Sequence, residues 1–246
     1  PYLDKSFEDL ELAARDAYEG TDYAVVGYFG GHIFMAALQL RGWQEFMVDL
    51  MTGSALADAL LDMLTEAHIR HFDRFARTVG KYIHVVHVED DLGMQDRPLL
   101  SPALYRKCIK PYHQRLYAAI KAQCRARLLL HSDGAISPLI PDLIEIGVEI
   151  LNPVQYTARD MDTKRLKREF GGQLSFWGGG CDTQQVLPFG TPAQVKEEVM
   201  RRIDDLAPGG GFVFAQVHNI QPHVPIENVL AMYQAVRERG TCGPAY

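Results

Sequence analysis

Two residues that can bind a metal follow a short apolar run near the middle of the chain. The stretch LLLHSDG places His131 and Asp133 two residues apart, directly after three leucines. In an extended strand such side chains project on the same side, so both can reach one ion or one proton. His218 and Cys181 follow two other apolar runs. Imidazole, thiolate and carboxylate all bind zinc, and a catalytic zinc leaves one coordination position open.

We therefore predict a zinc site among these four residues, with both histidines and either Asp133 or Cys181 as ligands. The spacing is not a local zinc motif, because the ligands would come from separate strands. The alternative for His131 is a structural role, in which its ring caps the strand by bonding to a neighbouring loop.

Three adjacent acids, Glu89, Asp90 and Asp91, follow another apolar run. Like charges this close raise the pKa of at least one of the carboxyl groups unless a metal or a cationic substrate offsets them. We predict that Asp90 or Asp91 is catalytic, by orienting the substrate or accepting a proton, and that Glu89 contacts the substrate. The alternative is a set of loop caps, in which Asp91 forms a turn before Leu92 and Gly93.

Polar and glycine residues also follow two further apolar runs. Gln155 is predicted to offer its amide to a polar group of the substrate, and Asn152 to contact the substrate. Gly179 lies in the run Gly178–Gly180, which lacks the GxGxxG pattern and the Walker lysine of phosphate loops. Close approach of the backbone to a ligand, or a tight turn, explains these glycines better.

The elements that must position these residues alternate along the chain. Six apolar runs are typical of strands buried on both faces, namely Tyr23–Phe29, Tyr82–Val88, Arg127–His131, Glu149–Val154, Leu174–Trp177 and Gly211–Val217. The intervening segments are predicted to be helices, and the two longest are Ala55–Thr78 and Tyr105–Cys124. Helix starts are indicated where a serine, threonine or valine precedes a proline, at 101–102, 137–138, 191–192 and 224–225. Such alternation predicts an α/β fold with a parallel sheet, either a closed barrel or a doubly wound sheet, with function at the C-terminal strand ends.

Composition excludes several classes of function. The chain has 246 residues and a formal net charge of -6, without a run of Lys and Arg, which argues against binding to nucleic acid. No apolar run approaches the roughly 20 residues that span a bilayer. The four cysteines form no CxxC pair and are typical of the reduced thiols of a cytoplasmic protein.

Five blocks of the sequence together resemble the uroporphyrinogen decarboxylase (URO-D) superfamily, in family order. They are GYFGGHIFMAALQLRGWQEFMVDL, EDDLGMQDRPLLSPALYRKCIKPYHQRL, LLLHSDGAISPLIPDLIEIGVEILNPVQ, LSFWGGGCDTQQVLPFGTPAQVKEEV and LAPGGGFVFAQVHNIQPHVPIENVLAM. The resemblance implies a TIM-type (β/α)8 barrel with its site at the C-terminal face.

The family barrel has eight strands, whereas the sequence shows six. We expect the two N-terminal βα units to be absent from this chain. Residues 1–246 would then form a single barrel domain that is the C-terminal three quarters of a full barrel. The chain is either a fragment or a divergent short form, or it contains strands that the pattern does not reveal. An open barrel would have two exposed edges, which favours pairing with a second copy as a homodimer.

The resemblance extends further to the methyltransferase-like branch of the superfamily. Its zinc enzymes carry a His-x-Cys where this chain has His131-Ser132-Asp133, and a later cysteine near the position of His218. The implied activity is metal-assisted transfer of a methyl group between a small methylated compound and an acceptor. That acceptor would be a thiol, a folate or a corrinoid carried by a partner protein.

Two alternatives remain. One is a cofactor-free decarboxylase that acts on a porphyrinogen-like acid, as in the other branch of the superfamily. The arginine-rich loop that holds the substrate carboxylates in those enzymes lies toward their N-terminus, outside this chain. The other alternative is a fragment that binds a ligand without turnover.

Overall fold

A computed structural model describes residues 7–239 of the chain. Contacts group these residues into two compact units. The first unit comprises 7–91, 100–131 and 139–149, and the second comprises 92–99, 132–138 and 150–239. The single barrel domain stays a prediction.

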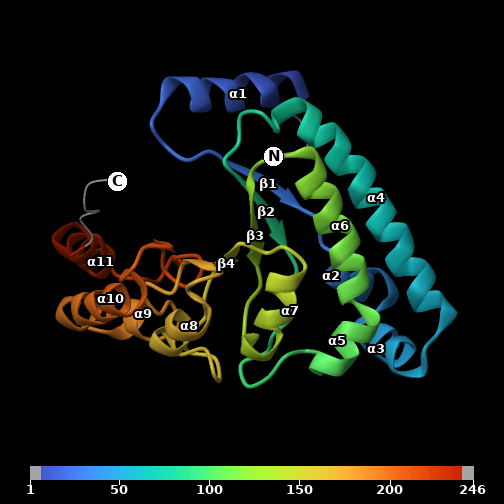
Figure 1. Cartoon of the computed structure of the whole chain (residues 1–246). Coiled ribbons are helices and arrows are strands. Elements are labelled where there is room, and N and C mark those ends of the chain that lie inside the picture. Colours follow the sequence, from blue (N-terminus) through green and yellow to red (C-terminus); the bar gives the residue numbers. More distant parts are fainter. Residues whose placement is uncertain (1–6, 240–246) are drawn as a thin grey trace. The chain divides into compact units, whose positions relative to one another are not determined.

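The first unit contains three strands, a helix that precedes them and the helices that follow each strand (Figure 1). Its elements in chain order are α1 (Phe7–Gly20), β1 (Val26–Gly30), α2 (Phe34–Arg41), α3 (Trp43–Thr52), α4 (Ala55–Val79), β2 (Val85–Glu89), α5 (Pro102–Cys108), α6 (Lys110–Gln123), β3 (Arg127–His131) and α7 (Ile140–Glu145). β1 pairs with β2, and β2 with β3, both in parallel. The C-terminal ends of these strands therefore lie at one edge of the sheet.

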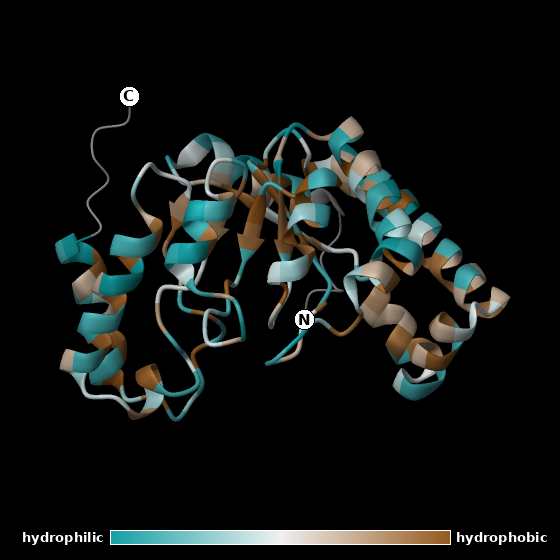
Figure 2. Ribbon diagram, turned by 60° about the horizontal axis from the view of Figure 1, so that its bottom comes forward, coloured by the Kyte–Doolittle hydropathy of each residue, from teal (hydrophilic) through white to brown (hydrophobic). Residues whose placement is uncertain are grey.

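The core of the first unit forms between one face of the strands and α4. Phe29 of β1 packs against Phe72 and Phe75 of α4, with ring centroids 5.0 and 5.7 Å apart. Figure 2 shows the strands in the colour of apolar residues, whereas the helices carry hydrophilic residues along part of their surface. Helices with one apolar side bury that side against a sheet and leave the other in water. α4 begins at an N-cap serine, Ser54, whose side chain accepts a hydrogen bond from the backbone N–H of Leu56.

The segment predicted as one helix over Tyr105–Cys124 is two helices, α5 and α6. The break falls at Ile109, where φ is -119° and α6 begins at the next residue. Pro111 explains the break, because proline has no backbone N–H to donate and its ring collides with the preceding turn of a helix. The other long helix is confirmed, and α4 ends one residue beyond the predicted bound.

The second unit contains the other three strands and their helices. Its elements are β4 (Ile150–Asn152), α8 (Thr163–Phe170), β5 (Ser175–Trp177), α9 (Val186–Phe189), α10 (Pro192–Leu206), β6 (Phe212–Val213) and α11 (Ile226–Arg239). The pairs β4–β5 and β5–β6 are parallel. α10 opens with a capping box, in which Thr191 and Gln194 each bond to the backbone of the other.

All six predicted strands are confirmed, and the strand order in the sheet follows the chain. The fold is thus α/β, with six parallel strands that alternate with helices, as in part of a TIM-type barrel. β6 is shorter than the predicted run Gly211–Val217, although its backbone pairing continues beyond it. Gly180 donates to the carbonyl of Ala215, and Val217 donates to the carbonyl of Cys181. Across residues 7–239, every helix is too short or too polar to cross a membrane.

Two loops of the second unit approach each other at glycines. A Cβ on Gly134 would lie 2.5 Å from the carbonyl carbon of Gly93, and φ at Gly134 is +88°. A Cβ on Gly93 would in turn lie 2.5 Å from the carbonyl oxygen of Asp133. Only glycine fits at both places, because any side chain would push the two backbones apart. This contact fixes the loop that carries Asp133.

We expect Gly134→Ala to lower the free energy of unfolding by about 2–4 kcal/mol, because it combines a backbone clash with an unfavourable φ. Gly209→Ala is the matched control, since Gly209 also has a positive φ (+78°) but nothing within 4 Å of its Cβ position. The control should cost about 1 kcal/mol. Urea denaturation of both variants measures the difference, and equal losses would show that the contact with Gly93 does not matter.

Candidate metal centre

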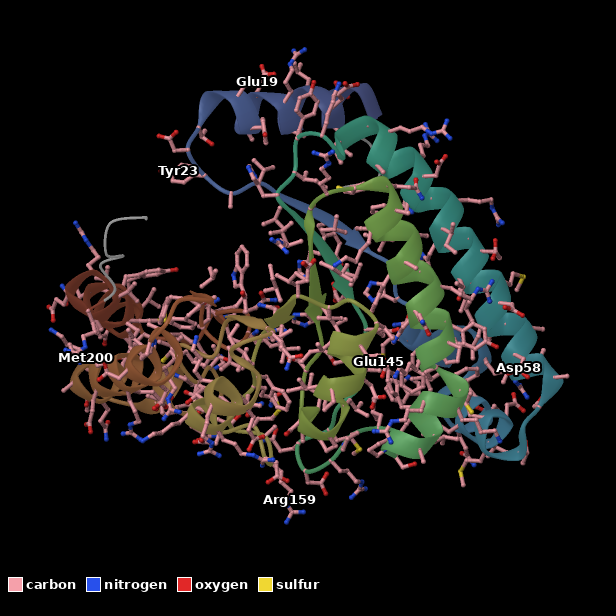
Figure 3. All side chains as sticks on the ribbon, in the orientation of Figure 1. Glu19, Tyr23, Asp58, Glu145, Arg159 and Met200 are labelled. Carbon is pink, nitrogen blue, oxygen red and sulfur yellow. The ribbon has the colours of Figure 1, made fainter. Side chains whose placement is uncertain are left out.

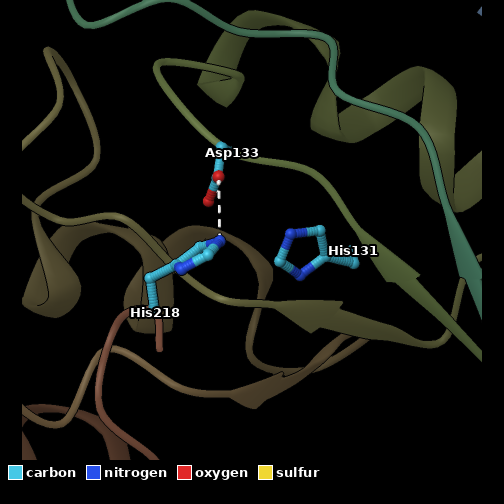
Figure 4. Close-up of side chains that lie close together, drawn as sticks. All are labelled: His131, Asp133 and His218. Atoms are coloured by element: carbon cyan, nitrogen blue, oxygen red, sulfur yellow. Dashed lines mark ion pairs between the residues drawn. The ribbon is translucent and has the colours of Figure 1, made fainter. Parts of the chain in front are cut away.

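Three of the four predicted metal ligands come together in the structure. His131, Asp133 and His218 each offer one ligand atom, and these atoms all lie within 4.8 Å of one another. Figure 4 shows the three side chains facing a common point. Nε2 of His218 lies 3.6 Å from Oδ2 of Asp133 as an ion pair. His131 ends β3 and precedes Asp133 by two residues, as the strand geometry predicts.

Hydrogen bonds fix the chain on both sides of Asp133. The buried hydroxyl of Ser132 accepts a hydrogen bond of 2.9 Å from the backbone N–H of Leu92. The backbone N–H of Gly134 donates to Oε1 of Gln155 at 2.8 Å. The stretch HSDG therefore alternates residues that can bind a ligand with residues that fix the chain. Asp133 is left only partly buried, with 32% of its side chain exposed.

His218 follows the extended segment after β6. Nδ1 of His218 accepts a hydrogen bond of 2.7 Å from the backbone N–H of Asn219. That bond fixes the ring and leaves Nε2 toward Asp133. Because Nδ1 accepts this bond, the proton of a neutral ring lies on Nε2, whereas a histidine metal ligand donates its second ring N–H to a neighbour. An ion bound at Nε2 would displace that proton. The side chain of His218 is 43% exposed.

The donor set fits a divalent ion that accepts nitrogen and oxygen ligands. Zinc binds imidazole and carboxylate at about 2.0–2.2 Å, and three protein ligands leave a fourth position for substrate or water. The separations in this group are close enough for one ion after small side-chain movements. The carboxylate makes the set harder than one that contains a thiolate, so manganese and other oxygen-preferring ions also suit it.

Cys181 does not belong to this group. Its side chain is fully buried in the core of the second unit, among apolar residues of α9, α10 and α11 that include Leu187, Val195 and Met232. Burial raises the pKa of the Cys181 thiol to about 12. A zinc ligand must be the thiolate, so this environment opposes the predicted role. Of the two alternatives for the third ligand, the structure brings Asp133 and not Cys181 to the histidines.

Asp90 caps the start of α2 from a neighbouring loop. Its carboxylate accepts hydrogen bonds of 2.7–2.9 Å from the backbone N–H groups of Ile33, Phe34 and Met35. It also bonds to Nε2 of His113 at 2.9 Å. Both side chains are 1% exposed. These four bonds occupy the carboxylate and give Asp90 a structural role; a catalytic role stays a prediction.

The other two acids differ from Asp90 in their surroundings. Glu89 is partly buried, and its Oε2 accepts a hydrogen bond of 2.6 Å from the hydroxyl of Tyr28. Burial and the adjacent carboxylate raise the pKa of Tyr28 to about 12. Asp91 is partly buried. A substrate contact at Glu89 and a catalytic role for Asp91 stay predictions.

The side-chain amides of Gln155 and Asn152, which are predicted to contact the substrate, form hydrogen bonds to other residues of the second unit. Oε1 of Gln155 accepts from Gly134, and its Nε2 donates to Gln95 at 3.0 Å. Nδ2 of Asn152 donates to the carbonyl of Trp177 at 2.8 Å. Both side chains therefore hold loops in place. A substrate could bond to either amide only through an additional lone pair of its oxygen or after the side chain had moved.

The glycine run has a structural explanation. Gly179 has φ +69°, and a Cβ on it would lie 3.1 Å from Val154. A Cβ on Gly178 would lie 2.2 Å from the carbonyl oxygen of Pro153. Close packing against the loop after β4 thus requires glycine here. Substrate binding at Gly179 stays a prediction.

Sequence reasoning missed three residues that hold the site in place. Ser132 fixes the Asp133 loop, and Gln95 bonds to both Gln155 and the carbonyl of Thr157. His113 bonds to Asp90 and through Nδ1 to the hydroxyl of Tyr105. The position of His113 among Ile109, Leu116 and Tyr117 marked it as buried, and a buried imidazole needs a polar partner.

Comparisons with known proteins give one family and one fold. The profile of the family described as uroporphyrinogen decarboxylase (URO-D) matches residues 7–239. Uroporphyrinogen decarboxylase of Thermus thermophilus is 25% identical over 219 residues, which are 87% of this chain and 59% of the relative. The enzyme of the same name from Neisseria meningitidis is 22% identical over 241 residues, which are 94% of this chain and 63% of the relative.

Among solved structures, a methyltransferase from Methanosarcina mazei has a similar fold, with a TM-score of 0.72 at 23% identity. The match covers 96% of this chain and 64% of that protein. This chain spans less than two thirds of the length of each of these three relatives.

We expect Asp90→Ala to lower the free energy of unfolding by about 3–5 kcal/mol, because it leaves buried N–H groups of α2 and the His113 ring without an acceptor. The control is Asp58→Ala, which removes a surface carboxylate from the first turn of α4 (Figure 3) and should cost less than about 1 kcal/mol. Chemical denaturation measures both values. A loss of similar size in the two variants would contradict the structural role of Asp90.

Proposed function

Because the chain belongs to the uroporphyrinogen decarboxylase (URO-D) family, we propose that it takes part in metal-assisted transfer of a methyl group from or to a small methylated compound. The acceptor or donor on the other side would be a thiol, a folate or a corrinoid bound to a partner protein. The metal would be zinc or another divalent ion held by His131, Asp133 and His218.

The observation that carries this proposal is the group of three ligands at the C-terminal ends of the strands. Metal-assisted methyl transfer needs an ion with a free coordination position, whereas decarboxylation of a porphyrinogen in this superfamily needs no metal. A bound ion would supply Lewis acidity toward the heteroatom that carries the methyl group. The fold shared with a methyltransferase of Methanosarcina mazei is compatible with this activity.

The protein groups around the ligands perform the positioning. Ser132 and Gln155 hold the backbone on the two sides of Asp133, so the chain that carries its carboxylate is fixed. The bond from the backbone of Asn219 holds the ring of His218. A site assembled in advance loses less entropy when substrate binds, which favours reaction in the correct geometry.

A second candidate function is decarboxylation of a porphyrinogen-like acid. The observation that favours it is the name of the curated relatives, which are uroporphyrinogen decarboxylases at 22–27% identity. Metal content separates the two candidates. In the decarboxylase, His218 would contact the substrate directly, and its loss would leave any metal content unchanged.

The metal content of the purified protein tests the proposal. We expect about one divalent ion per chain in the wild type, with zinc the first candidate, and at least a tenfold loss of affinity in His131→Ala, Asp133→Ala and His218→Ala. Cys181→Ala should retain the metal, since that thiol is buried in the core. His71→Ala, which removes an exposed histidine of α4, is a second control. Elemental analysis that finds no metal in wild type would exclude the proposal.

A carboxylate at position 133 should also determine which metal binds. We expect Asp133→Cys to raise affinity for zinc and cadmium relative to manganese, because a thiolate is a softer ligand than a carboxylate. Competition with a chromophoric chelator measures the affinities for the three metals in both proteins. An unchanged order of preference would show that position 133 does not contact the ion.

A further inference from the structure

The loop after β2 forms a short hairpin over residues 92–99. Its turn is closed where the backbone N–H of Met94 donates to the carbonyl of Arg97 at 2.7 Å. Gln95 lies in this turn and is exposed. A surface side chain of this kind can usually be replaced at little cost. Gln95 differs from such residues, because both its side chain and its backbone carbonyl bond to another loop.

Three hydrogen bonds join Gln95 to the loop after β4. Its Nε2 donates to the carbonyl of Thr157 at 2.8 Å, and its Oε1 accepts from Nε2 of Gln155 at 3.0 Å. Its backbone carbonyl accepts from the N–H of Arg159 at 2.9 Å. The three partners are alternate residues of one segment. Gln95 therefore fixes the hairpin along this loop through matched donors and acceptors.

Gln155 extends this connection to the loop that carries Asp133. It is buried, and its Oε1 accepts from the N–H of Gly134, the residue after Asp133, at 2.8 Å. Its Nε2 is the atom that donates to Gln95. One end of this amide is thus bonded to the hairpin, and the other end is bonded to the backbone beside a predicted metal ligand.

The orientation of each amide follows from that of its neighbour. The two ends of a glutamine amide have nearly the same shape, but the oxygen only accepts and the nitrogen only donates. The carbonyl of Thr157 accepts, so Gln95 turns its Nε2 toward it and its Oε1 toward Gln155. Gln155 then presents its Nε2 to Gln95 and its Oε1 to the N–H of Gly134. In the opposite orientation of Gln155, two donors would face each other at Gly134 and its N–H would lose its partner.

We propose that Gln95 is a positioning residue of the metal centre, which acts through Gln155 on the backbone beside Asp133. This inference rests on the proposed function, since it takes Asp133 as a metal ligand, and it assigns to that site a residue outside the ligand group. Without the side chain of Gln95, the amide of Gln155 loses the acceptor that fixes its orientation. The bond from Gly134 to Gln155 then weakens, and the chain holds Asp133 less firmly.

Gln95→Met tests the inference, because it removes both bonding ends of the side chain and keeps its length. The backbone N–H of Ala135 still donates to the carbonyl of Met94 at 2.7 Å, so the two loops stay in contact. In metal-free protein, we expect the amide of Gly134 to exchange its hydrogen at least about fivefold faster by NMR, since the stabilisation of about one hydrogen bond is lost. The affinity for zinc, measured by competition with a chromophoric chelator, should fall about fivefold, less than for the loss of a direct partner of a ligand.

Two comparisons separate positioning from a general effect of substitution. Gln95→Glu keeps an acceptor for Gln155 and should recover part of the protection of Gly134 in metal-free protein. Only the exchange rate is compared for this variant, because its added charge attracts a cation by itself. Gln173→Met replaces another exposed glutamine, in the turn before β5, and should change neither the exchange of Gly134 nor the affinity for zinc.

The variant Gln155→Met shows whether Gln95 acts through Gln155. It should lower the affinity for zinc about tenfold. Adding Gln95→Met to it should cause no further loss, because the residue that transmits the effect is already gone. Independent losses that add in the double variant would overturn the inference.

The results also distinguish this inference from the proposed function. A wild type that binds no metal refutes the proposed function, and the exchange of Gly134 in the metal-free proteins still tests whether Gln95 fixes that backbone. Equal exchange rates in Gln95→Met and wild type overturn the inference even when zinc binds. An unchanged affinity for zinc in Gln95→Met, or an equal change in Gln173→Met, overturns it as well.

Discussion

The contact between the backbones of Gly93 and Gly134 is the constraint on which the rest of the site depends. It brings the loop after β2 against the loop after β3 so closely that neither position has room for a Cβ. Leu92, on one side of this contact, donates to Ser132, and Gly134 donates to Gln155. Asp133 lies between these two fixed points. Its carboxylate can be exposed and yet positioned, because the backbone and not the side chain is held.

Much of this site could be predicted because parallel strands end at one edge of a sheet. His218 lies far from His131 and Asp133 in the sequence, but all three follow apolar runs, and the pattern of runs is readable without a structure. Cys181 also follows such a run, yet it points into the core. The sequence could not decide this, because one residue of difference along an extended chain exchanges the two faces. The apolar neighbours that bury Cys181 come from α9, α10 and α11, and no local pattern ties them to it.

The three acids show a different limit of prediction. Glu89, Asp90 and Asp91 are adjacent and chemically similar, so the sequence gives them similar claims to a catalytic role. Their partners distinguish them, and those partners are distant in the chain. Asp90 meets the N–H groups of α2, more than 50 residues earlier, as well as His113 on α6. The break between α5 and α6 could have been predicted, because Pro111 lies inside the run predicted as one helix. The apolar periodicity on both sides of Pro111 favoured a continuous helix instead.

Residues at the strand ends differ in what their side chains contact. Asp90, Gln155 and Asn152 bond to the backbone of nearby loops, so they contribute order to the site. The ligand group of His131, Asp133 and His218 instead gathers donors of electron pairs that repel or compete unless a cation or a proton lies between them. Nε2 of His87, next to that group, has no hydrogen-bond partner among residues 7–239. A folded chain retains a buried atom without a partner only at a cost, so this nitrogen beside the three metal-binding side chains is a physical reason to place ligand chemistry there.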